Sequence, residues 1–383
     1  MGVFKINNIR DFKRCLKKAI NEKSSSINSF YRALKEYTKI HPMTAIKTDN
    51  WFDIGHIDKY YDSKLEVQSR EFNHIIVDKE RGILTKSSDD IEKFLGEIKW
   101  YLKLPSDLEY SRPRIFKYSL NYNSPFISME YYSYHTIHEL FLYGTLEYQQ
   151  WVEVFERIKF IINDYERYKL KDIKIKESLN EMYLEKTIKR LNSLRQNKQF
   201  QVFFDRPISI NGVKYKSLND IVEILKEIIP QKLYNIDEFN IIHGDLCFAN
   251  IMIDSNLNFI KLIDPRGKFG KFDIYGDARY EMAKLFHSLD GGYDYIIKDL
   301  FDLEINNNNI KLKINKSNYT FNLFEIFKDV FKDKIKNNLE EIELIESLLF
   351  FSMTPLHKES KSHQIAMMCR GIQILDKIIN IKE

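Results

Sequence analysis

The sequence is organised around one segment, Ile241-Ile242-His243-Gly244-Asp245-Leu246-Cys247-Phe248-Ala249-Asn250. Its pattern is H-G-D-x-x-x-x-N, and a second acid, Asp264, stands fourteen positions after Asn250. A phosphoryl-transfer site needs one carboxylate that takes a hydroxyl proton, and an amide and a second carboxylate that hold magnesium. The spacing of Asp245, Asn250 and Asp264 predicts a site of this kind.

The residues between Asn250 and Asp264 predict a β-hairpin. Two short apolar runs, 251–253 and 259–263, flank the turn-forming sequence at 254–258. Antiparallel pairing brings the ends of a hairpin together, so Asn250 and Asp264 can reach one hard cation. Asp245 lies on the loop that enters this hairpin, where a carboxylate can orient an acceptor hydroxyl and take its proton.

The segment resembles the catalytic loop of the aminoglycoside phosphotransferase and choline/ethanolamine kinase superfamily, which shares the protein-kinase fold. The resemblance implies that Asp245 is the catalytic base, that Asn250 and Asp264 bind Mg²⁺, and that His243 holds the loop. Asp264 is followed by Pro265-Arg266-Gly267 and not by the Phe-Gly of protein kinases, which favours a small-molecule kinase.

The same resemblance implies an α+β, two-lobed protein-kinase-like fold with a small β-rich N-lobe and a larger helical C-lobe. We expect residues 1–65 to form a helical N-terminal extension, with helices over 8–21 and 27–40. Residues 66–132 would form the N-lobe, and residues 133–383 the C-lobe with the catalytic loop and the acceptor site.

The stretch from Trp51 to Lys64 is similar to the junction in fused proteins where a sugar nucleotidyltransferase precedes a kinase-like domain. The sequence has no nucleotidyltransferase glycine-rich loop, so that activity is not expected.

A kinase-like N-lobe needs a strand lysine that pairs with a helix glutamate to hold the nucleotide phosphates. The sequence predicts strands over 72–77 and 83–86, and then a helix capped by Asp89 with Glu92 three residues on. Apolar residues of that helix recur at helical periodicity, and Glu97 lies on the flank of the apolar stripe. We therefore predict a Lys86–Glu97 pair, with Glu92 as the reserve candidate; ordinary surface charges are the alternative.

The apolar run at 125–132 resembles the strand that joins the two lobes, where backbone groups read the adenine edge of ATP. Glu130 and Tyr131 are the predicted hinge residues, and an ordinary sheet strand is the alternative. No G-x-G-x-x-G precedes Lys86, which argues against a protein kinase more than against a kinase in general.

Two further residues near the motif have a predicted supporting role. Asp277 begins a helix-like stretch and has a structural explanation as a helix cap braced against the catalytic loop. Arg266 would pair with a substrate or phosphate anion, or lie on the surface. Cys247 has no activating neighbour and is expected to fill apolar space.

The acceptor site is less well marked in the sequence. All the tryptophans precede the catalytic loop, so no aromatic cage for a quaternary ammonium can be assigned. A run of glutamates at 340–346 favours a solvated helix face over the acidic site that an aminoglycoside needs. The polar stretch Ser352–His357 is a candidate lining of the acceptor pocket.

Composition bounds the remaining possibilities. The 383 residues are 44% hydrophobic and carry a formal net charge of +4, with no basic stripe of the kind that nucleic-acid binding needs. No apolar run is long enough to span a membrane, and the N-terminus lacks the apolar core of a signal peptide. Three widely spaced cysteines fit reduced thiols, so we expect a cytoplasmic protein. Nothing in the sequence indicates an oligomeric state.

The sequence thus favours an ATP- and Mg²⁺-dependent kinase that phosphorylates a hydroxyl of a small metabolite. A sugar, an amino alcohol or a surface-polysaccharide precursor fits best. The alternatives are a nucleotide-binding regulatory or scaffold protein with this fold and no turnover, and a protein kinase.

Overall fold

The structure is a computed structural model, and it describes residues 5–21, 26–44, 73–316, 319 and 322–382. The chain divides into two compact units, Met1–Arg70 and Glu71–Glu383. The junction-like stretch from Trp51 to Lys64 lies outside the described residues.

The described residues of the first unit form two helices, α1 (Ile9–Asn21) and α2 (Ser26–Ile40), and both predicted helices are confirmed. Phe12, Cys15 and Ala19 of α1 recur at helical spacing and pack with Ala33 and Tyr37 of α2 in a small core.

The N-lobe of the second unit is an antiparallel sheet in the order β1-β2-β4-β3. Its strands are β1 (Asn73–Asp78), β2 (Ile83–Ser88), β3 (Ile115–Ser119) and β4 (Phe126–Glu130). Helix α4 (Ile91–Lys103) follows β2, and its apolar stripe is buried at Phe94, Ile98 and Tyr101.

The predicted cap of α4 was wrong. Pairing of Ser88 with Asn73 draws residues beyond Lys86 into β2, so the N-cap of α4 is Asp90, which makes no side-chain cap hydrogen bond. Asp89 instead contacts the ring of His74 at 3.3 Å, and Glu92 is exposed.

The C-lobe begins with short strand β5 (His135–Thr136), α5 (Ile137–Tyr143) and α6 (Tyr148–Glu166). The helical chain is interrupted between α5 and α6, because α5 ends at Gly144, which has an extended conformation. The next helical stretch is continuous and consists of α7 (Ile175–Leu179), a π-helical segment η2 (Asn180–Glu185) and α8 (Lys186–Arg195).

Two three-stranded sheets hold the segment that bears the H-G-D-x-x-x-x-N pattern. Strand β9 (Phe239–Ile241) lies between β6 (Lys169–Leu170) and β12 (Tyr275–Gly276), and β10 (Ile251–Ile253) lies between β5 and β11 (Ile260–Leu262). The segment from β9 to β10 thus passes from one sheet to the other. The predicted hairpin after Asn250 is confirmed, because β10 and β11 pair antiparallel.

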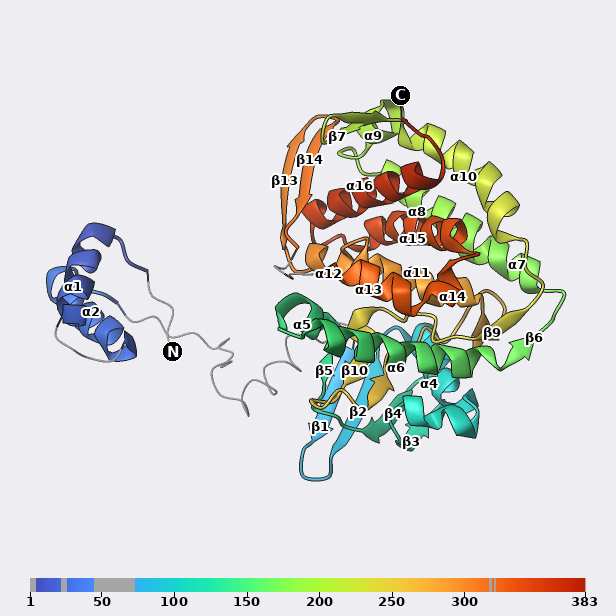
Figure 1. Ribbon diagram of the computed structural model, residues 1–383, viewed down its shortest axis with the longest axis horizontal. Helices are drawn as coiled ribbons and strands as arrows, with labels where there is room; N and C mark the ends of the chain where they lie inside the picture. The colour runs from blue at the N-terminus through green and yellow to red at the C-terminus, as the bar shows by residue number, and fades with distance from the viewer. Residues whose placement is uncertain (1–4, 22–25, 45–72, 317–318, 320–321, 383) are drawn as a thin grey trace. The chain divides into compact units, whose positions relative to one another are not determined.

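The centre of the C-lobe is helical (Figure 1). Helix α11 (Ala278–Leu289) packs on α15 (Leu339–Met353), which packs on α16 (Lys361–Ile378). Every residue of α11 from Arg279 to Leu289 is buried. The two-lobed α+β architecture that the sequence predicts is confirmed.

The remaining helices and strands are short or peripheral to the site. They are η1 (Ser106–Ser111), α9 (Gln201–Asp205), β7 (Ile208–Ile210), β8 (Val213–Tyr215), α10 (Leu218–Leu233), η3 (Phe248–Asn250), α12 (Tyr293–Ile296), β13 (Phe301–Asn306), β14 (Asn309–Ile314), α13 (Leu323–Val330), α14 (Lys332–Ile335) and η4 (Thr354–Leu356). Among the described residues, no helix combines the length and apolar character that crossing a membrane requires.

Candidate active site

The loop between β9 and η3 owes its shape to Gly244. This residue has φ +75°, and a Cβ atom there would lie 2.8 Å from the Cβ of Arg266. Only glycine meets both conditions without strain. The glycine of the H-G-D motif therefore lets the loop turn against the segment that follows Asp264.

Helix α11 anchors this loop through a buried carboxylate. Glu281 accepts the backbone N–H groups of His243 and Gly244 at 2.9 and 2.8 Å. Because α11 is buried on all sides, a charged residue on it needs a partner. Glu281 finds that partner in the catalytic loop, and it fixes the peptide units next to Asp245.

His243 has a structural environment. Its ring is fully buried and lies edge-on to Trp100, with ring centroids 5.4 Å apart. Burial lowers its pKa to about 4, so the imidazole is neutral near pH 7. This environment agrees with the loop-holding role that the resemblance implies.

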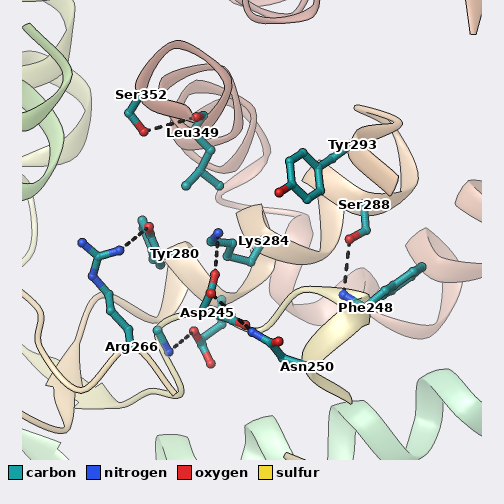
Figure 2. Close-up of polar contacts among 12 residues, drawn as sticks. Asp245, Phe248, Asn250, Arg266, Tyr280, Lys284, Ser288, Tyr293, Leu349 and Ser352 are labelled. Carbon is teal, nitrogen blue, oxygen red and sulfur yellow. Dashed lines mark hydrogen bonds and ion pairs between the residues drawn. The ribbon is translucent and has the colours of Figure 1, made fainter. Parts of the chain in front are cut away.

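Asp245 faces a buried lysine from α11. The Nζ atom of Lys284 lies 2.6 Å from Asp245 Oδ1, and the side chain of Lys284 is 7% exposed while that of Asp245 is 31% exposed. Burial acts to raise the pKa of Asp245, but the Lys284 ammonium outweighs it and holds that pKa below its usual range. Asp245 is therefore an ionised, partly accessible carboxylate (Figure 2).

Asn250 is oriented by Asp245. Its side-chain amide nitrogen donates to the Asp245 carbonyl at 2.9 Å and to Asp245 Oδ2 at 3.3 Å. The NH₂ group thus faces the loop, and Asn250 can present its Oδ1 atom to a cation. The N–H of Ile263 donates to the Asn250 carbonyl at 3.0 Å, which brings Asp264 to the same end of the hairpin.

Asp264 has φ +55°, a conformation that Asp tolerates better than most residues. Its backbone N–H donates to the Tyr101 hydroxyl at 3.1 Å, and its Oδ1 atom accepts from Lys86 Nζ at 2.8 Å. A carboxylate and an amide oxygen at one hairpin end are the oxygen donors that Mg²⁺ prefers. Asn250 and Asp264 therefore fit a magnesium site.

Lys86 and Glu97 form the pair that the sequence predicts. Lys86 Nζ donates to both Glu97 carboxylate oxygens at 2.8 and 2.9 Å, and both residues are buried. Burial acts to lower the pKa of Lys86, but the carboxylates of Asp264 and Glu97 together raise it. The lysine therefore carries its charge at neutral pH.

One face of α4 connects the N-lobe with the catalytic segments. Glu97 binds Lys86, and three residues later the Trp100 indole N–H donates to the Ile242 carbonyl at 2.7 Å. Tyr101, next along that face, accepts the Asp264 N–H. Side chains from a single helix face thus contact the strand lysine, the catalytic loop and the second acid.

The predicted hinge residues lie at the end of β4. The backbone N–H of Glu130 donates to the Arg114 carbonyl at 2.9 Å, and that of Tyr131 donates to the Gly82 carbonyl at 2.8 Å. These N–H groups take part in sheet contacts, so a nucleotide could use the carbonyls of Glu130 and Tyr131 as acceptors but not these donors.

Asp277 is the helix cap that the sequence predicts, but the predicted brace on the loop comes from another residue. Asp277 caps α11 and is bound by Arg279 and by the Tyr183 hydroxyl at 2.8 Å. The brace on the catalytic loop that we expected from Asp277 comes from Glu281.

Cys247 is buried, and burial raises its pKa to about 12, which agrees with the apolar filler that the sequence predicts.

Arg266 is half-buried and turns toward α11. Its Nε atom donates to the Lys268 carbonyl at 2.9 Å, and a guanidinium nitrogen lies 3.5 Å from the Tyr280 hydroxyl. Figure 2 shows Arg266, Tyr280 and Lys284 in one region beside Asp245, with Ser352 of α15 across from them. Ser352, from the candidate acceptor stretch, thus lies in this region.

Sequence reasoning missed Glu281 and Lys284. Both lie in the helix-like stretch after Asp277. They are three residues apart and share one face of the helix, while Met282, Phe286 and Leu289 form an apolar face. This pattern favours a solvated charged face, and the burial of the two residues depends on tertiary contacts.

No protein-family model matches the chain, and no curated protein sequence matches it. Solved structures do resemble it. The ADP-bound aminoglycoside phosphotransferase APH(2'')-Ib is 14% identical, with a TM-score of 0.48, and the match covers 84% of this chain and 99% of that protein.

Two other solved structures show a similar likeness. A thermostable mutant of the aminoglycoside phosphotransferase APH(4)-Ia is 10% identical over 82% of this chain and 93% of its own, with a TM-score of 0.48. The complex of APH(2'')-IIa with streptomycin and ATP is 13% identical over 87% and 99%, with a TM-score of 0.47. At these identities and TM-scores the comparisons report a likeness of fold only.

Proposed function

We propose that the chain is an ATP- and Mg²⁺-dependent phosphotransferase of the aminoglycoside phosphotransferase and choline/ethanolamine kinase superfamily. Its acceptor is a hydroxyl of a small metabolite such as a sugar, an amino alcohol or a surface-polysaccharide precursor. One observation carries the proposal: Lys86 bridges Glu97 and Asp264 at 2.8 Å. From the helix that bears Glu97, Trp100 donates to the Ile242 carbonyl in the segment of Asp245, and Tyr101 accepts the Asp264 N–H.

The nucleotide phosphates would lie at Lys86. Its charge is maintained by Glu97 and Asp264, so it can offset phosphate charge as the strand lysine of a kinase does. The carbonyls of Glu130 and Tyr131 would accept from the adenine amino group. Asn250 and Asp264 would hold Mg²⁺, which when bound neutralises phosphate charge.

The acceptor hydroxyl would meet Asp245. The oxygen of the acceptor hydroxyl would form a bond to the γ-phosphorus of ATP. The bond from that phosphorus to the oxygen that bridges it to the β-phosphorus would break, ADP would leave, and the hydroxyl proton would pass to Asp245. Because Lys284 keeps the pKa of Asp245 low, the carboxylate is a weak base. Its main contribution is to orient the hydroxyl, and positioning of this kind supplies most of the catalysis in this class.

The second candidate is a nucleotide-binding regulatory or scaffold protein without turnover. The contact of Lys284 with Asp245 at 2.6 Å favours it, since a carboxylate so paired is less available to a hydroxyl. The accessible Asp245 side chain and the complete Asp–Asn–Asp set argue for turnover.

The deciding experiment measures ADP formation with ATP and Mg²⁺ across sugars, amino alcohols, aminoglycosides and nucleosides, with Asp245→Asn as control. Turnover that the variant loses supports the kinase. ATP binding by calorimetry without turnover on any acceptor supports the regulatory protein, and an absence of ATP binding refutes both.

A further inference from the structure

Four basic side chains gather on the C-lobe side of Asp245; we refer to them as the basic cluster. Two of them, Lys284 from α11 and Arg266 from the segment after Asp264, lie in the region that Figure 2 shows. The other two, Lys186 and Arg190, come from α8, which packs against α15. Sequence reasoning assigned no role to either α8 residue.

Helical spacing places Lys186 and Arg190 on one face of α8, because they are four residues apart. The π-helical segment η2 ends immediately before Lys186. Such segments are rare in proteins as a whole, but those that occur are often found at functional sites, since the extra residue redirects the side chains that follow. Both side chains are half-buried, whereas Lys189 of the same helix is exposed.

The α8 pair and Arg266 contact neutral groups. Lys186 Nζ lies 5.6 Å from the centre of the Tyr280 ring, and Arg190 donates to the Ser352 carbonyl at 3.1 Å. Arg266 contacts a carbonyl and the Tyr280 hydroxyl. Within the part of the chain that the structure describes, no carboxylate lies within ion-pair distance of these three residues.

The cluster carries more positive charge than Asp245 offsets. Burial, together with the charges of Arg266, Arg190 and Lys284, lowers the pKa of Lys186 well below its usual value, although the Asp245 carboxylate acts in the opposite direction. Burial and Arg266 likewise lower the pKa of Arg190. Half-buried like charges repel one another and lose solvation, so an arrangement of this kind is typical of a site that receives a negative group.

We infer that the phosphate acceptor is itself an anion: a small hydroxylated metabolite bearing a phosphate monoester or a carboxylate, held at that group by Lys186 and Arg190. The inference rests on the proposed function, because it places the free hydroxyl of the acceptor at Asp245. Arginine and lysine at one site suit such groups, since a guanidinium binds two anionic oxygens at once and an ammonium adds a point charge.

The position of the cluster separates this role from nucleotide binding. The nucleotide phosphates are expected at Lys86, which belongs to strand β2 of the N-lobe. Lys186 and Arg190 contact Tyr280 and Ser352, which belong to α11 and α15 of the C-lobe. Lys284 contacts Asp245 and Arg266 follows Asp264 closely in the sequence, so neither residue is assigned to the anion alone.

The cluster also argues against a cationic acceptor such as an aminoglycoside. Two of the glutamates of α15 are poorly suited to bind a cation, because Glu340 pairs with Lys232 and Glu346 is fully buried. Burial raises the pKa of Glu346 well above its usual value, which favours its neutral form. The expected solvated face is thus wrong for Glu346.

The first test measures ADP formation with a charge series built on several carbon skeletons, each offered as the neutral polyol or sugar, the phosphate monoester, the carboxylate and the amine. We expect turnover of an anionic member, with kcat/KM at least about 100-fold above its neutral counterpart. Lys186→Met and Arg190→Met should each raise KM for that acceptor by about 10-fold or more and leave KM for ATP unchanged. Lys189→Met is the matched control and should change neither.

Preferential turnover of a neutral or cationic member would overturn the inference and leave the kinase proposal intact. The same holds if the two variants change KM for ATP but not for the acceptor.

A second test does not depend on turnover. The ADP-saturated protein is titrated with inorganic phosphate, and thermal unfolding is followed. Phosphate should raise the unfolding temperature of the unaltered chain and of Lys189→Met, and a Lys186→Met/Arg190→Met double variant should lose most of that rise. An equal rise in the double variant would refute an anion site at α8 even if no acceptor is ever turned over.

Discussion

Gly267→Ala tests the contact between α4 and the segment after Asp264. Gly267 has φ +72°, and a Cβ atom built there would lie 2.1 Å from the carbonyl carbon of Gly96 and 2.5 Å from the backbone nitrogen of Glu97. Ordinary contacts to a Cβ atom begin at 3.4 Å, so the two backbones must separate by more than about an ångström. That movement displaces the helix turn that carries Glu97.

The expected cost has two parts. A non-glycine residue in the left-handed conformation costs about 1–2 kcal/mol, and forcing an extra methyl group into a packed contact adds about 1–3 kcal/mol. We therefore expect Gly267→Ala to lower the free energy of unfolding by about 2–5 kcal/mol. A misplacement of this size is also enough to reduce reactivity by about 100-fold.

The matched control is Gly212→Ala. Gly212 has φ +85° in the β7–β8 turn, and nothing lies within 4 Å of its added Cβ atom, so it incurs only the conformational part. Urea unfolding gives the free energies, and calorimetry gives ADP affinity, which should fall in Gly267→Ala alone. If the two variants lose equal stability and bind ADP equally, the close approach of α4 to the Asp264 segment is refuted.

Three further outcomes are expected. Lys86→Met should abolish measurable ADP binding by calorimetry and destabilise the protein, because it leaves the buried Glu97 carboxylate without its cation; unchanged affinity would contradict the phosphate role. Lys284→Met should raise the pKa of Asp245, since burial then acts without the opposing ammonium, so the acid limb of the kcat/KM profile should move to higher pH; Lys284→Arg should keep it in place. Burial keeps His287 neutral in the folded protein, while the unfolded chain takes up a proton below a pH of about 6.5. This group therefore lowers the free energy of unfolding by up to about 1.4 kcal/mol for each pH unit of acidification. Urea unfolding at pH 5–6.5 should show a smaller decrease with falling pH in His287→Phe than in the unaltered chain. An equal decrease in both would show that His287 does not titrate in this way.

The local sequence pattern was enough to predict the site residues whose interaction partners are close in sequence. Asn250 and Asp264 are joined by one short hairpin, so alternation and turn residues placed them together. Lys86 and Glu97 are separated by a strand end and two helical turns, and helical periodicity located the glutamate although the cap of that helix was wrong. In both cases a few local rules fix the geometry.

The residues that were missed depend on contacts between distant elements. Lys284 reaches Asp245, and Lys186 lies over Tyr280, only because α11 and α8 are brought together by packing. In a chain where 30% of residues are charged, single lysines on helices read as surface residues. A buried cation differs from a surface one by its tertiary surroundings, which periodicity on one helix does not contain.

The left-handed backbone at Asp264 has a consequence for how its carboxylate is studied. Alanine at this position would change the charge and, at the same time, disfavour the backbone conformation, so any loss would combine two effects. Asparagine tolerates φ near the observed +55° and differs from aspartate by the charge alone. The variants Asp264→Asn and Asp264→Ala therefore separate two contributions of this residue. The loss in Asp264→Asn measures the contribution of the negative charge. The additional loss in Asp264→Ala measures the contribution of the left-handed backbone conformation, at which the chain reverses direction.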